Sequence, residues 1–244
     1  MTYSVITACL NSAGTLRRSI DSVLLQSPLP AEYIFVDGGS SDSTLEIIRH
    51  TAEAAVKDGL PVKIRIINQN EKTGITGAWN LALKEITADA VFILNSDDWY
   101  EPVAAAEVLD VFKKNLSVDI VYGPIFFHRG KEKYLRKCRP LAMFPVMMPI
   151  AHPGCFVKKS VYDKVGLFEQ KYRISADYEF LYRCYSKGVK FCRIRKPLVN
   201  MELGGTANSN RGTARKETLE IGRKYCRVPL LPELAFFARV LAGR

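Results

Sequence analysis

No two cysteines lie close together in this chain of 244 residues, and histidine and tryptophan are scarce, with three and two copies. The six cysteines form no C-x-x-C pair and no zinc-like cluster. Several lie in apolar runs, where a cysteine is a small buried hydrophobe. A zinc site and a disulfide framework are therefore excluded, and a reducing cytoplasmic compartment is expected.

Further absences narrow the class of protein. There is no basic leader, so no signal peptide is expected, and no apolar run approaches the ~20 residues that span a bilayer. The G-x-G-x-x-G fingerprint is missing, which makes a Rossmann dinucleotide enzyme a weak alternative. No segment interleaves aromatic with basic residues, and no helix-turn-helix or zinc-finger pattern is present. Nucleic acid is accordingly not an expected partner.

Charge is unevenly divided along the chain. Residues 1–126 hold 10 Lys and Arg against 16 Asp and Glu, whereas residues 127–244 hold 25 against 9. Any single basic residue is more often a solvated surface charge. A whole basic half, however, implies an anionic partner, and without nucleic-acid-binding motifs an acidic membrane surface or a phosphorylated ligand is favoured over nucleic acid.

Strand-like and helical segments alternate through the first half of the chain. We expect strands at residues 3–10, 33–36, 62–67, 91–94 and 120–122, and helices at 11–25, from 43 onward, 76–86 and 102–112. In the second half we expect an irregular stretch over residues 123–155, a helix at 176–186, a strand at 189–194 and a loop at 204–210 that orders over a bound ligand. Alternation of this kind predicts βαβ units and a parallel sheet.

Acidic residues follow two of the expected strands. The apolar strand at 91–94 runs directly into Asn95-Ser96-Asp97-Asp98. Adjacent carboxylates at a buried strand end repel each other and are costly to desolvate, unless a divalent cation lies between them and an anionic ligand. Oxygen ligands alone suit Mg²⁺ or Mn²⁺. An ordinary Asp-rich turn is the alternative.

Asp37 stands at the end of the strand at 33–36 and opens the segment Asp37–Asp42. A strand-to-helix turn explains Asp42 and the serines of that segment but does not require Asp37. A carboxylate there can accept hydrogen bonds from a ribose or a base. Ligands gather at the carboxyl ends of parallel strands, so one crevice is expected to hold both Asp37 and Asp97.

Ordered blocks along the chain resemble family 2 glycosyltransferases of the GT-A fold. These blocks are Ser4–Thr7 with Asn11, Val36–Asp42, Gly74-Ile75 through Asn80, and Leu94–Asp98. Farther on, the acceptor-side blocks of the bacterial polysaccharide branch, which includes colanic acid and O-antigen enzymes, are similar to His152-Pro153, Gly166–Phe168 and Ile174–Tyr178. The resemblance implies an α/β GT-A fold, with a mostly parallel central sheet flanked by helices. It also implies a nucleotide-diphospho-sugar donor of UDP or GDP type and Mn²⁺ or Mg²⁺.

The resemblance also implies roles for single residues. The donor would be contacted by Thr7, Asn11, Asp37, Asn80, Asn95 and Asp97. Asp97, helped by Asp98, would bind the metal on the diphosphate. Asp177 would be the general base, although a helix N-terminal acid favoured by the helix dipole is the alternative for that residue. His152 and Trp99 are weaker candidates for acceptor contacts, because a lone His before Pro and a Trp are more often structural.

One base without an enzyme nucleophile implies direct displacement with inversion at the anomeric carbon. A glycosidase would instead need two carboxylates flanking the bond. Four positions depart from the family pattern, namely Ala8, Leu10, Gly77 and Asn95. Ala8 and Leu10 leave open whether the donor carries UDP or GDP, and Gly77 removes one possible contact with the donor sugar. The amide of Asn95 favours a ribose contact over a metal contact for that residue.

The expected organisation is a nucleotide-sugar-binding half at residues 1–122, an acceptor-binding half at 123–228 and an apolar, basic tail at 229–244. The tail is expected to lie in a membrane interface, to close a homodimer or to pack on its own domain. A polyprenyl-diphosphate-linked saccharide at the inner membrane surface is the expected acceptor. The alternatives are a basic nucleic-acid or membrane-surface binding protein, and a sugar nucleotidyltransferase, for which the Gly-rich triphosphate loop is missing.

Overall fold

Short apolar strands and amphipathic helices build the first half of the protein. The computed structural model describes residues 1–203 and 211–241, so the loop expected at 204–210 lies outside the described residues. The strands here are β1 (Tyr3–Cys9), β2 (Glu32–Asp37), β3 (Lys63–Asn68), β4 (Ala90–Ile93), β5 (Trp99–Tyr100) and β6 (Ile120–Tyr122). The helices are α1 (Ala13–Leu24), α2 (Thr44–Lys57), α3 (Gly74–Glu85) and α4 (Ala104–Lys114). The alternation expected for this half is confirmed.

The second half is more regular than expected. Its strands are β7 (Ile125–Arg129), β8 (Glu132–Arg136), β9 (Cys155–Lys158), β10 (Phe191–Arg193) and β11 (Val199–Glu202), and its short 3-10 helices are η1 (Leu141–Met143) and η2 (His152–Gly154). Its α-helices are α5 (Lys159–Val165), α6 (Ala176–Ser186), α7 (Arg211–Tyr225) and α8 (Leu231–Leu241). The prediction of an irregular stretch at 123–155 is wrong, because this stretch contains the β7–β8 hairpin, whose partner β11 lies far along the sequence.

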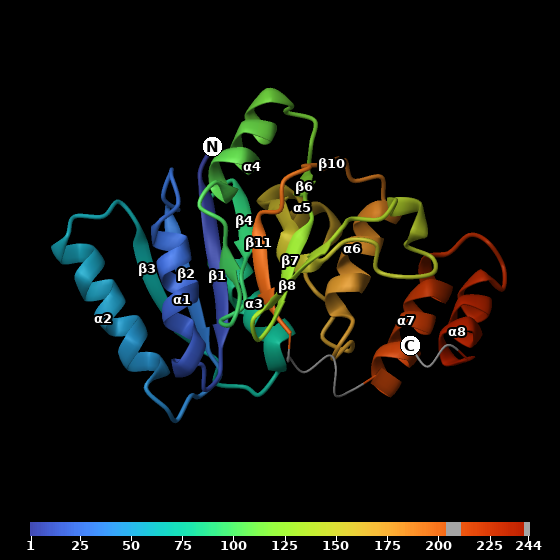
Figure 1. Cartoon of the computed structure of the whole chain (residues 1–244), viewed down its shortest axis with the longest axis horizontal. Helices are drawn as coiled ribbons and strands as arrows, with labels where there is room; N and C mark the ends of the chain where they lie inside the picture. Colours follow the sequence, from blue (N-terminus) through green and yellow to red (C-terminus); the bar gives the residue numbers. More distant parts are fainter. Residues whose placement is uncertain (204–210, 242–244) are drawn as a thin grey trace.

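Seven strands form the central sheet in the order β10-β6-β9-β4-β1-β2-β3 (Figure 1). All neighbours in it are parallel except β9, which runs antiparallel between β4 and β6. A second sheet has the order β5-β11-β7-β8. The expected α/β fold with a mostly parallel central sheet flanked by helices is confirmed, and β9 joins the second half of the chain to the first.

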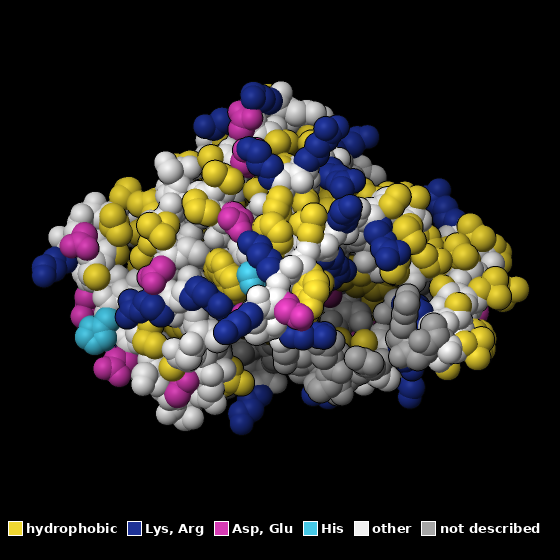
Figure 2. All heavy atoms as spheres, viewed as in Figure 1, with side chains coloured by type: hydrophobic (Ala, Val, Ile, Leu, Met, Phe, Trp, Pro, Cys, Tyr) yellow, Lys and Arg dark blue, Asp and Glu magenta, His cyan; other side chains and the backbone are white. Residues whose placement is uncertain are grey.

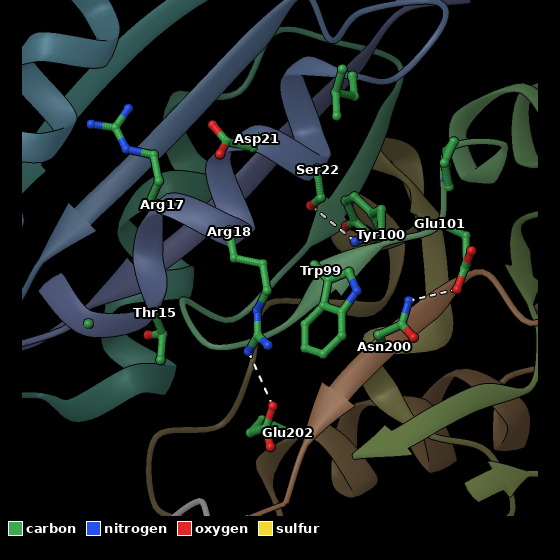
Figure 3. Close-up of a pocket in the computed structure, with 13 residues that line it drawn as sticks. Thr15, Arg17, Arg18, Asp21, Ser22, Trp99, Tyr100, Glu101, Asn200 and Glu202 are labelled. Carbon is green, nitrogen blue, oxygen red and sulfur yellow. Dashed lines mark hydrogen bonds and ion pairs between the residues drawn. The ribbon is translucent and has the colours of Figure 1, made fainter. Parts of the chain in front are cut away.

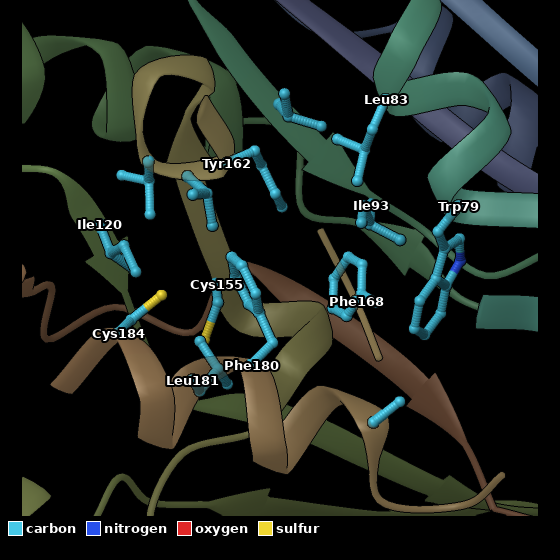
Figure 4. Packing of buried hydrophobic residues seen from close by; sticks show 14 of the residues in the cluster. Trp79, Leu83, Ile93, Ile120, Cys155, Tyr162, Phe168, Phe180, Leu181 and Cys184 are labelled. Atoms are coloured by element: carbon cyan, nitrogen blue, oxygen red, sulfur yellow. The ribbon is translucent and has the colours of Figure 1, made fainter. Parts of the chain in front are cut away.

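Two apolar clusters cover the two faces of the central sheet. Side chains alternate along β1, so Val5 packs in the cluster with α1, α2 and α4, while Ile6 packs in the cluster with α3, α5 and α6. Figure 4 shows the second cluster, in which Ile93 of β4 meets Phe168 and Phe180. A fully buried side chain of this size contributes about 1.5–3 kcal/mol.

Buried polar contacts join α6 to the end of α5 and the segment that follows it. The Arg183 guanidinium donates to the carbonyl oxygens of Val165 (2.9 Å) and Leu167 (2.6 Å), and it pairs with the Glu179 carboxylate at 3.1 Å. These contacts compensate most of a charge that is only 8% exposed, and among the described residues only Nε of this guanidinium is left without a hydrogen-bond partner. The segment that follows α5 is thereby held against α6.

Gly154 gives a test of the contact between η2 and the turn that joins β6 to β7. A Cβ atom at this position would lie 2.8 Å from the Gly123 carbonyl oxygen and 2.8 Å from Ile125 Cγ2. Gly154→Ala is expected to destabilise the protein by about 1–3 kcal/mol. Gly14→Ala, where a Cβ would meet nothing within 4 Å, is the matched control and should be neutral or slightly stabilising. Equal unfolding midpoints for the two variants would contradict this packing.

Candidate active site

The loops that follow β1, β2 and β4 meet at one edge of the central sheet. In the register of the parallel strands, Cys9 pairs with Asp37 and Asp37 pairs with Asn68. On the other side of β1, the Leu94 amide donates to the Ile6 carbonyl at 2.9 Å, so β4 delivers the carboxylate loop to the same edge. The fold therefore brings the loops that carry Asp37 and Asp97 to the same edge of the sheet, where ligands of parallel α/β sheets gather.

Asn11 ties these loops together. It adopts a left-handed backbone conformation (φ 50°), which Asn tolerates better than most residues. Its side-chain oxygen accepts a hydrogen bond from the backbone amide of Ser41 at 2.8 Å, and its backbone amide donates to Ser40 Oγ at 2.9 Å. Beside it, the hydroxyl oxygens of Ser12 and Ser96 lie 2.9 Å apart. Asn11 thus holds the loop after β1 to the loop after β2.

Asp37 closes the turn after β2. One carboxylate oxygen accepts the amides of Gly39 and Ser40, both at 2.9 Å, and the other accepts the Ser40 hydroxyl at 2.6 Å. Our sequence interpretation that this turn does not require Asp37 is wrong, because the carboxylate satisfies the turn amides. Its contact with a nucleoside stays a prediction.

Three polar residues of the carboxylate loop form the acidic centre of the site. Asp98 is only 1% exposed, and it accepts hydrogen bonds from Asn95 Nδ2 at 2.9 Å and from the Glu202 amide at 3.3 Å. Burial, and then the charge of Asp97, raises the pKa of Asp98 to about 8. Burial also raises the pKa of Asp97, which the nearby Arg18 charge opposes.

This centre fits a cation that prefers oxygen ligands. Within residues 1–203 and 211–241, Asn95 Oδ1 is buried without a hydrogen-bond partner. Both oxygens of Asp98 are engaged, whereas Asp97 is half-buried, so Asp97 is the better placed ligand. The described part of the chain holds no group of three or more His, Cys, Asp or Glu that could bind a metal. A Mg²⁺ or Mn²⁺ ion here would take its other ligands from a ligand's phosphates and from water.

Arg18 and Trp99 flank the acidic centre. Arg18 donates to the Asp97 carbonyl oxygen at 3.0 Å and to the Glu202 carboxylate at 3.3 Å, and its guanidinium lies 3.6 Å from the centre of the Trp99 ring. Beside them, a groove of about 800 Å³ runs between α1, β5 and β11 (Figure 3). The His128 ring lies 4.6 Å from the Trp99 ring. Trp99 therefore packs between two side chains at the rim of the site.

Asp177 approaches the same edge of the sheet from the second half of the chain. Because β9 is antiparallel, its first residue, Cys155, pairs with Tyr122 at the carboxyl end of β6. Asp177 is the second residue of α6 and accepts the amide of Tyr178 at 2.7 Å. Its charge reaches Cys155, whose thiol pKa is raised by burial first and by Cys138 and Asp177 next. Asp177 thus lies near the residue of β9 that starts at the carboxyl edge of the sheet.

Burial raises the pKa of the Asp177 carboxyl to about 6, against the opposing positive charge of Arg136 on β8. A carboxyl group with this pKa is mostly ionised at neutral pH and is a stronger base than an ordinary aspartate. This property suits a general base.

Three predicted site residues are placed in the interior instead. Thr7 is fully buried, with its hydroxyl 3.1 Å from that of Tyr33. Asn80 donates to the Phe168 carbonyl at 2.8 Å and accepts the Phe168 amide at 3.0 Å. Both side chains are committed to the fold, so we leave them out of the site proposed below.

His152 is the third of these residues. It is 5% exposed and packs against the rings of Trp79 (5.1 Å) and Phe168 (5.7 Å). Burial lowers its pKa to about 4, so the ring is neutral at physiological pH and carries no charge for a phosphate. Trp79 itself belongs to the buried cluster.

Sequence reasoning missed Arg18, Arg136 and Glu202. Arg18 lies on an exposed face of its helix, and Arg136 lies in the stretch interpreted as irregular. Their roles depend on contacts across the chain, such as the ion pair between Arg18 and Glu202. Only the excess of basic residues in the second half indicated that cations would line the acceptor side.

The chain belongs to the Glycosyl transferase family 2, whose pattern matches residues 4–168. It is therefore a glycosyltransferase. This membership decides against the binding protein and the nucleotidyltransferase that the sequence left open.

Among similar sequences is a "PGL/p-HBAD biosynthesis glycosyltransferase" of Mycobacterium bovis, 27% identical over 210 residues, which cover 85% of this chain and 79% of the relative. An "Uncharacterized glycosyltransferase" of Nostoc is 33% identical over 122 residues, covering 50% of this chain and 36% of the relative. The mycobacterial sequence matches along most of both chains.

Solved structures of GT-A type share the fold. The mannosyltransferase PcManGT of Pyrobaculum calidifontis, in complex with GDP-Man and Mn²⁺, has a TM-score of 0.71 at 18% identity, covering 97% of this chain and 69% of its own. S. aureus TarS 1–349 in complex with UDP-GlcNAc has a TM-score of 0.70 at 17% identity, covering 91% and 64%. The GT-A fold expected from the sequence is thus confirmed.

Asn80 offers a test of its placement. Asn80→Ala removes two hydrogen bonds to the Phe168 backbone and leaves both groups buried, so we expect a loss of about 2–3 kcal/mol of stability. Affinity for a nucleoside diphosphate, measured by calorimetry on the folded variant, should stay within about twofold of wild type, less than one hydrogen bond contributes. A large loss of affinity without a loss of stability would restore Asn80 to the donor site.

Proposed function

We propose that the enzyme transfers a sugar, with inversion, from a nucleotide-diphospho-sugar to a hydroxyl of a lipid-linked saccharide. The observation that carries this proposal is the position of Asp177, a half-buried carboxyl group in the first turn of α6 near Cys155, where β9 starts at the carboxyl edge of the sheet. In this assignment Asp97 is the metal ligand, assisted by Asp98, and Asn95 contacts the donor ribose.

Each residue has a definite task in the reaction. Asp177 accepts the proton of the acceptor hydroxyl while that oxygen forms a bond to the anomeric carbon. The bond from this carbon to the diphosphate breaks on the opposite side, and the nucleoside diphosphate leaves with the bonding electrons. A bound Mn²⁺ or Mg²⁺ would act as a Lewis acid on the diphosphate. Asn11 and Asp37 keep the loops of the nucleoside side in place.

The donor is proposed by analogy in fold. The neighbours described above are complexes with GDP-Man and Mn²⁺ and with UDP-GlcNAc, which supports a hexose or N-acetylhexosamine donor but leaves the base open. For the acceptor, we propose a saccharide of the cell-surface polysaccharide type, as in colanic acid or O-antigen assembly. The mycobacterial relative, by its name a biosynthetic glycosyltransferase, is consistent with an assembly role.

A lipid-linked acceptor requires access to a membrane surface. No helix in the described ranges is long and apolar enough to cross a bilayer. Helix α8 packs on α7 through an ion pair between Arg223 and Glu233 (2.8 Å), yet Leu234, Phe237 and Leu241 are 60–88% exposed. These residues recur at helical spacing along one stripe. Figure 2 shows apolar side chains gathered at the end of the molecule that α8 forms.

Donor binding tests the site directly. We expect UDP or GDP to raise the unfolding temperature in the presence of Mn²⁺, and ligand at 100 times its dissociation constant should add about 2.7 kcal/mol. Asp97→Ala should abolish the metal-dependent part of this shift. Asp58→Ala, at the exposed C-terminal end of α2, is the control and should behave as wild type. A full shift in Asp97→Ala would remove this residue from the metal site.

Asp177→Asn separates catalysis from stability. Transfer should fall by about 10²–10⁴-fold with donor binding retained, because an amide cannot accept the proton. The wild-type rate should fall as the pH drops through about 6.

The raised folded-state pKa of Asp177 means that the native protein binds one more proton than the unfolded chain between about pH 4 and 6. Ionised Asp177 therefore destabilises the fold above that range. Asp177→Asn should therefore melt higher than wild type at pH 7.5, with the difference vanishing near pH 4.

The exposed stripe of α8 is expected to bind anionic bilayers. Phe237→Ser, or deletion of residues 229–244, should reduce sedimentation with vesicles rich in anionic phospholipid at low salt. Val56→Ser is a matched control, because Val56 is 82% exposed on α2. Unchanged binding of both α8 variants would dismiss α8 as the membrane contact.

A further inference from the structure

Helix α7 is bonded to the segment that leads into α6. Glu220 accepts hydrogen bonds from Lys171 Nζ (2.8 Å) and from the Tyr172 hydroxyl (3.0 Å). Lys224 pairs with Glu169 at 2.5 Å. Of these residues, Glu220 and Lys224 lie on the exposed surface of α7, whereas Tyr172 is buried under it.

Glu217 of α7 differs from these residues because it is buried and bonds to backbone. It is 8% exposed, and its carboxylate accepts the amides of Arg173 (2.8 Å), Ile174 (3.0 Å) and Ser175 (2.8 Å). Burying a carboxylate is unfavourable unless hydrogen bonds replace its water. Three charge-assisted bonds to backbone amides provide that replacement.

The three amides stand at the start of α6. Ser175 is the N-cap residue of this helix, but its side chain makes no capping hydrogen bond. Glu217 therefore supplies, from another helix, the negative acceptor that favours a helix N-terminus. Asp177 follows two residues later in the first turn of α6.

Charged and titratable groups on three surrounding elements interact electrostatically with the Asp177 carboxyl group. Arg136 on β8 favours its ionised form, whereas Glu217 on α7 disfavours it, and Cys155 of β9 lies within reach of its charge. Arg173 and Glu179 are the charged neighbours on its own segment and helix. Glu217 thus acts on Asp177 both through the backbone turn and through its charge.

We propose that Glu217 is a positioning residue for the general base, because it fixes the first turn of α6 and so the direction in which Asp177 meets the acceptor hydroxyl. This inference rests on the proposed role of Asp177 as the base. It adds a residue of α7, outside the matched family region at residues 4–168, to the catalytic apparatus.

Glu217→Gln tests the proposal, with Glu220→Gln as a matched control on the same helix. The amide keeps the size of the side chain but loses the charge and one acceptor oxygen. We expect kcat to fall about tenfold, the scale of a small misplacement of a catalytic group, with the donor KM within about twofold of wild type. The acid limb of the kcat–pH profile should move to lower pH, since a negative charge beside Asp177 is removed. Glu220→Gln should keep the wild-type kcat and profile.

A role limited to holding the fold would lower the unfolding temperature of Glu217→Gln without moving the acid limb, and this result would overturn the proposal. Asp177→Asn separates the two claims. If it remains active, the base assignment fails and the role of Glu217 falls with it. If Asp177→Asn is inactive while Glu217→Gln matches wild type, only the role of Glu217 is refuted.

Hydrogen exchange tests the same contact in case Glu217→Gln does not fold. In the wild-type protein the amides of residues 173–175 should exchange far more slowly than those of an exposed loop, because Glu217 holds all three. Exchange at the rate of a free loop would overturn the proposal without any variant.

Discussion

The burial of carboxylates at one edge of a parallel sheet is the constraint on which the rest of this structure depends. Each acid there is unfavourable to desolvate, and each is compensated differently. Asp37 is satisfied by turn amides, and Asp98 by Asn95 and the Glu202 amide. Asp97 and Asp177 are compensated least, and burial raises the pKa of both. The carboxylates whose charge the fold itself satisfies are thus distinct from Asp97 and Asp177, whose charge is left for a bound ligand to compensate.

The antiparallel strand β9 explains how one chain brings the proposed metal ligand and the proposed general base toward the same edge of the sheet. It lies between β4 and β6, and its first residue starts at the edge where those strands end. The segment after β9 therefore leads α6, and with it Asp177, to the edge that carries Asp97. Helix α7 then holds the start of α6 through Glu217. The division into donor and acceptor halves describes the order of the sequence, whereas the central sheet contains strands from both.

The first half of the fold was predictable because its signals are local. Alternating apolar segments defined β1 to β4 and α1 to α4, and the resemblance of motif blocks added the GT-A fold. The sequence did not predict the β7–β8 hairpin, because its basic residues interrupt the apolar alternation typical of a strand. The pairing of β7 with β11, far along the sequence, is what defines it as part of a sheet. Among the candidate site residues, the loops of Asp37 and Asp97 lie at the edge that the strand pattern predicts. The interior position of Asn80 and the charge state of His152 depend on tertiary burial, which a motif does not report.

The central claim is that the carboxylate loop after β4 holds a cation on the donor diphosphate, facing Asp177. Anomalous X-ray scattering from a crystal grown with Mn²⁺ and a nucleoside diphosphate tests it most directly. We expect an anomalous peak within coordination distance of an Asp97 carboxylate oxygen, with the diphosphate on its far side and Asp177 across the sugar position. Nucleotide bound elsewhere, or Mn²⁺ bound away from Asp97, would contradict it.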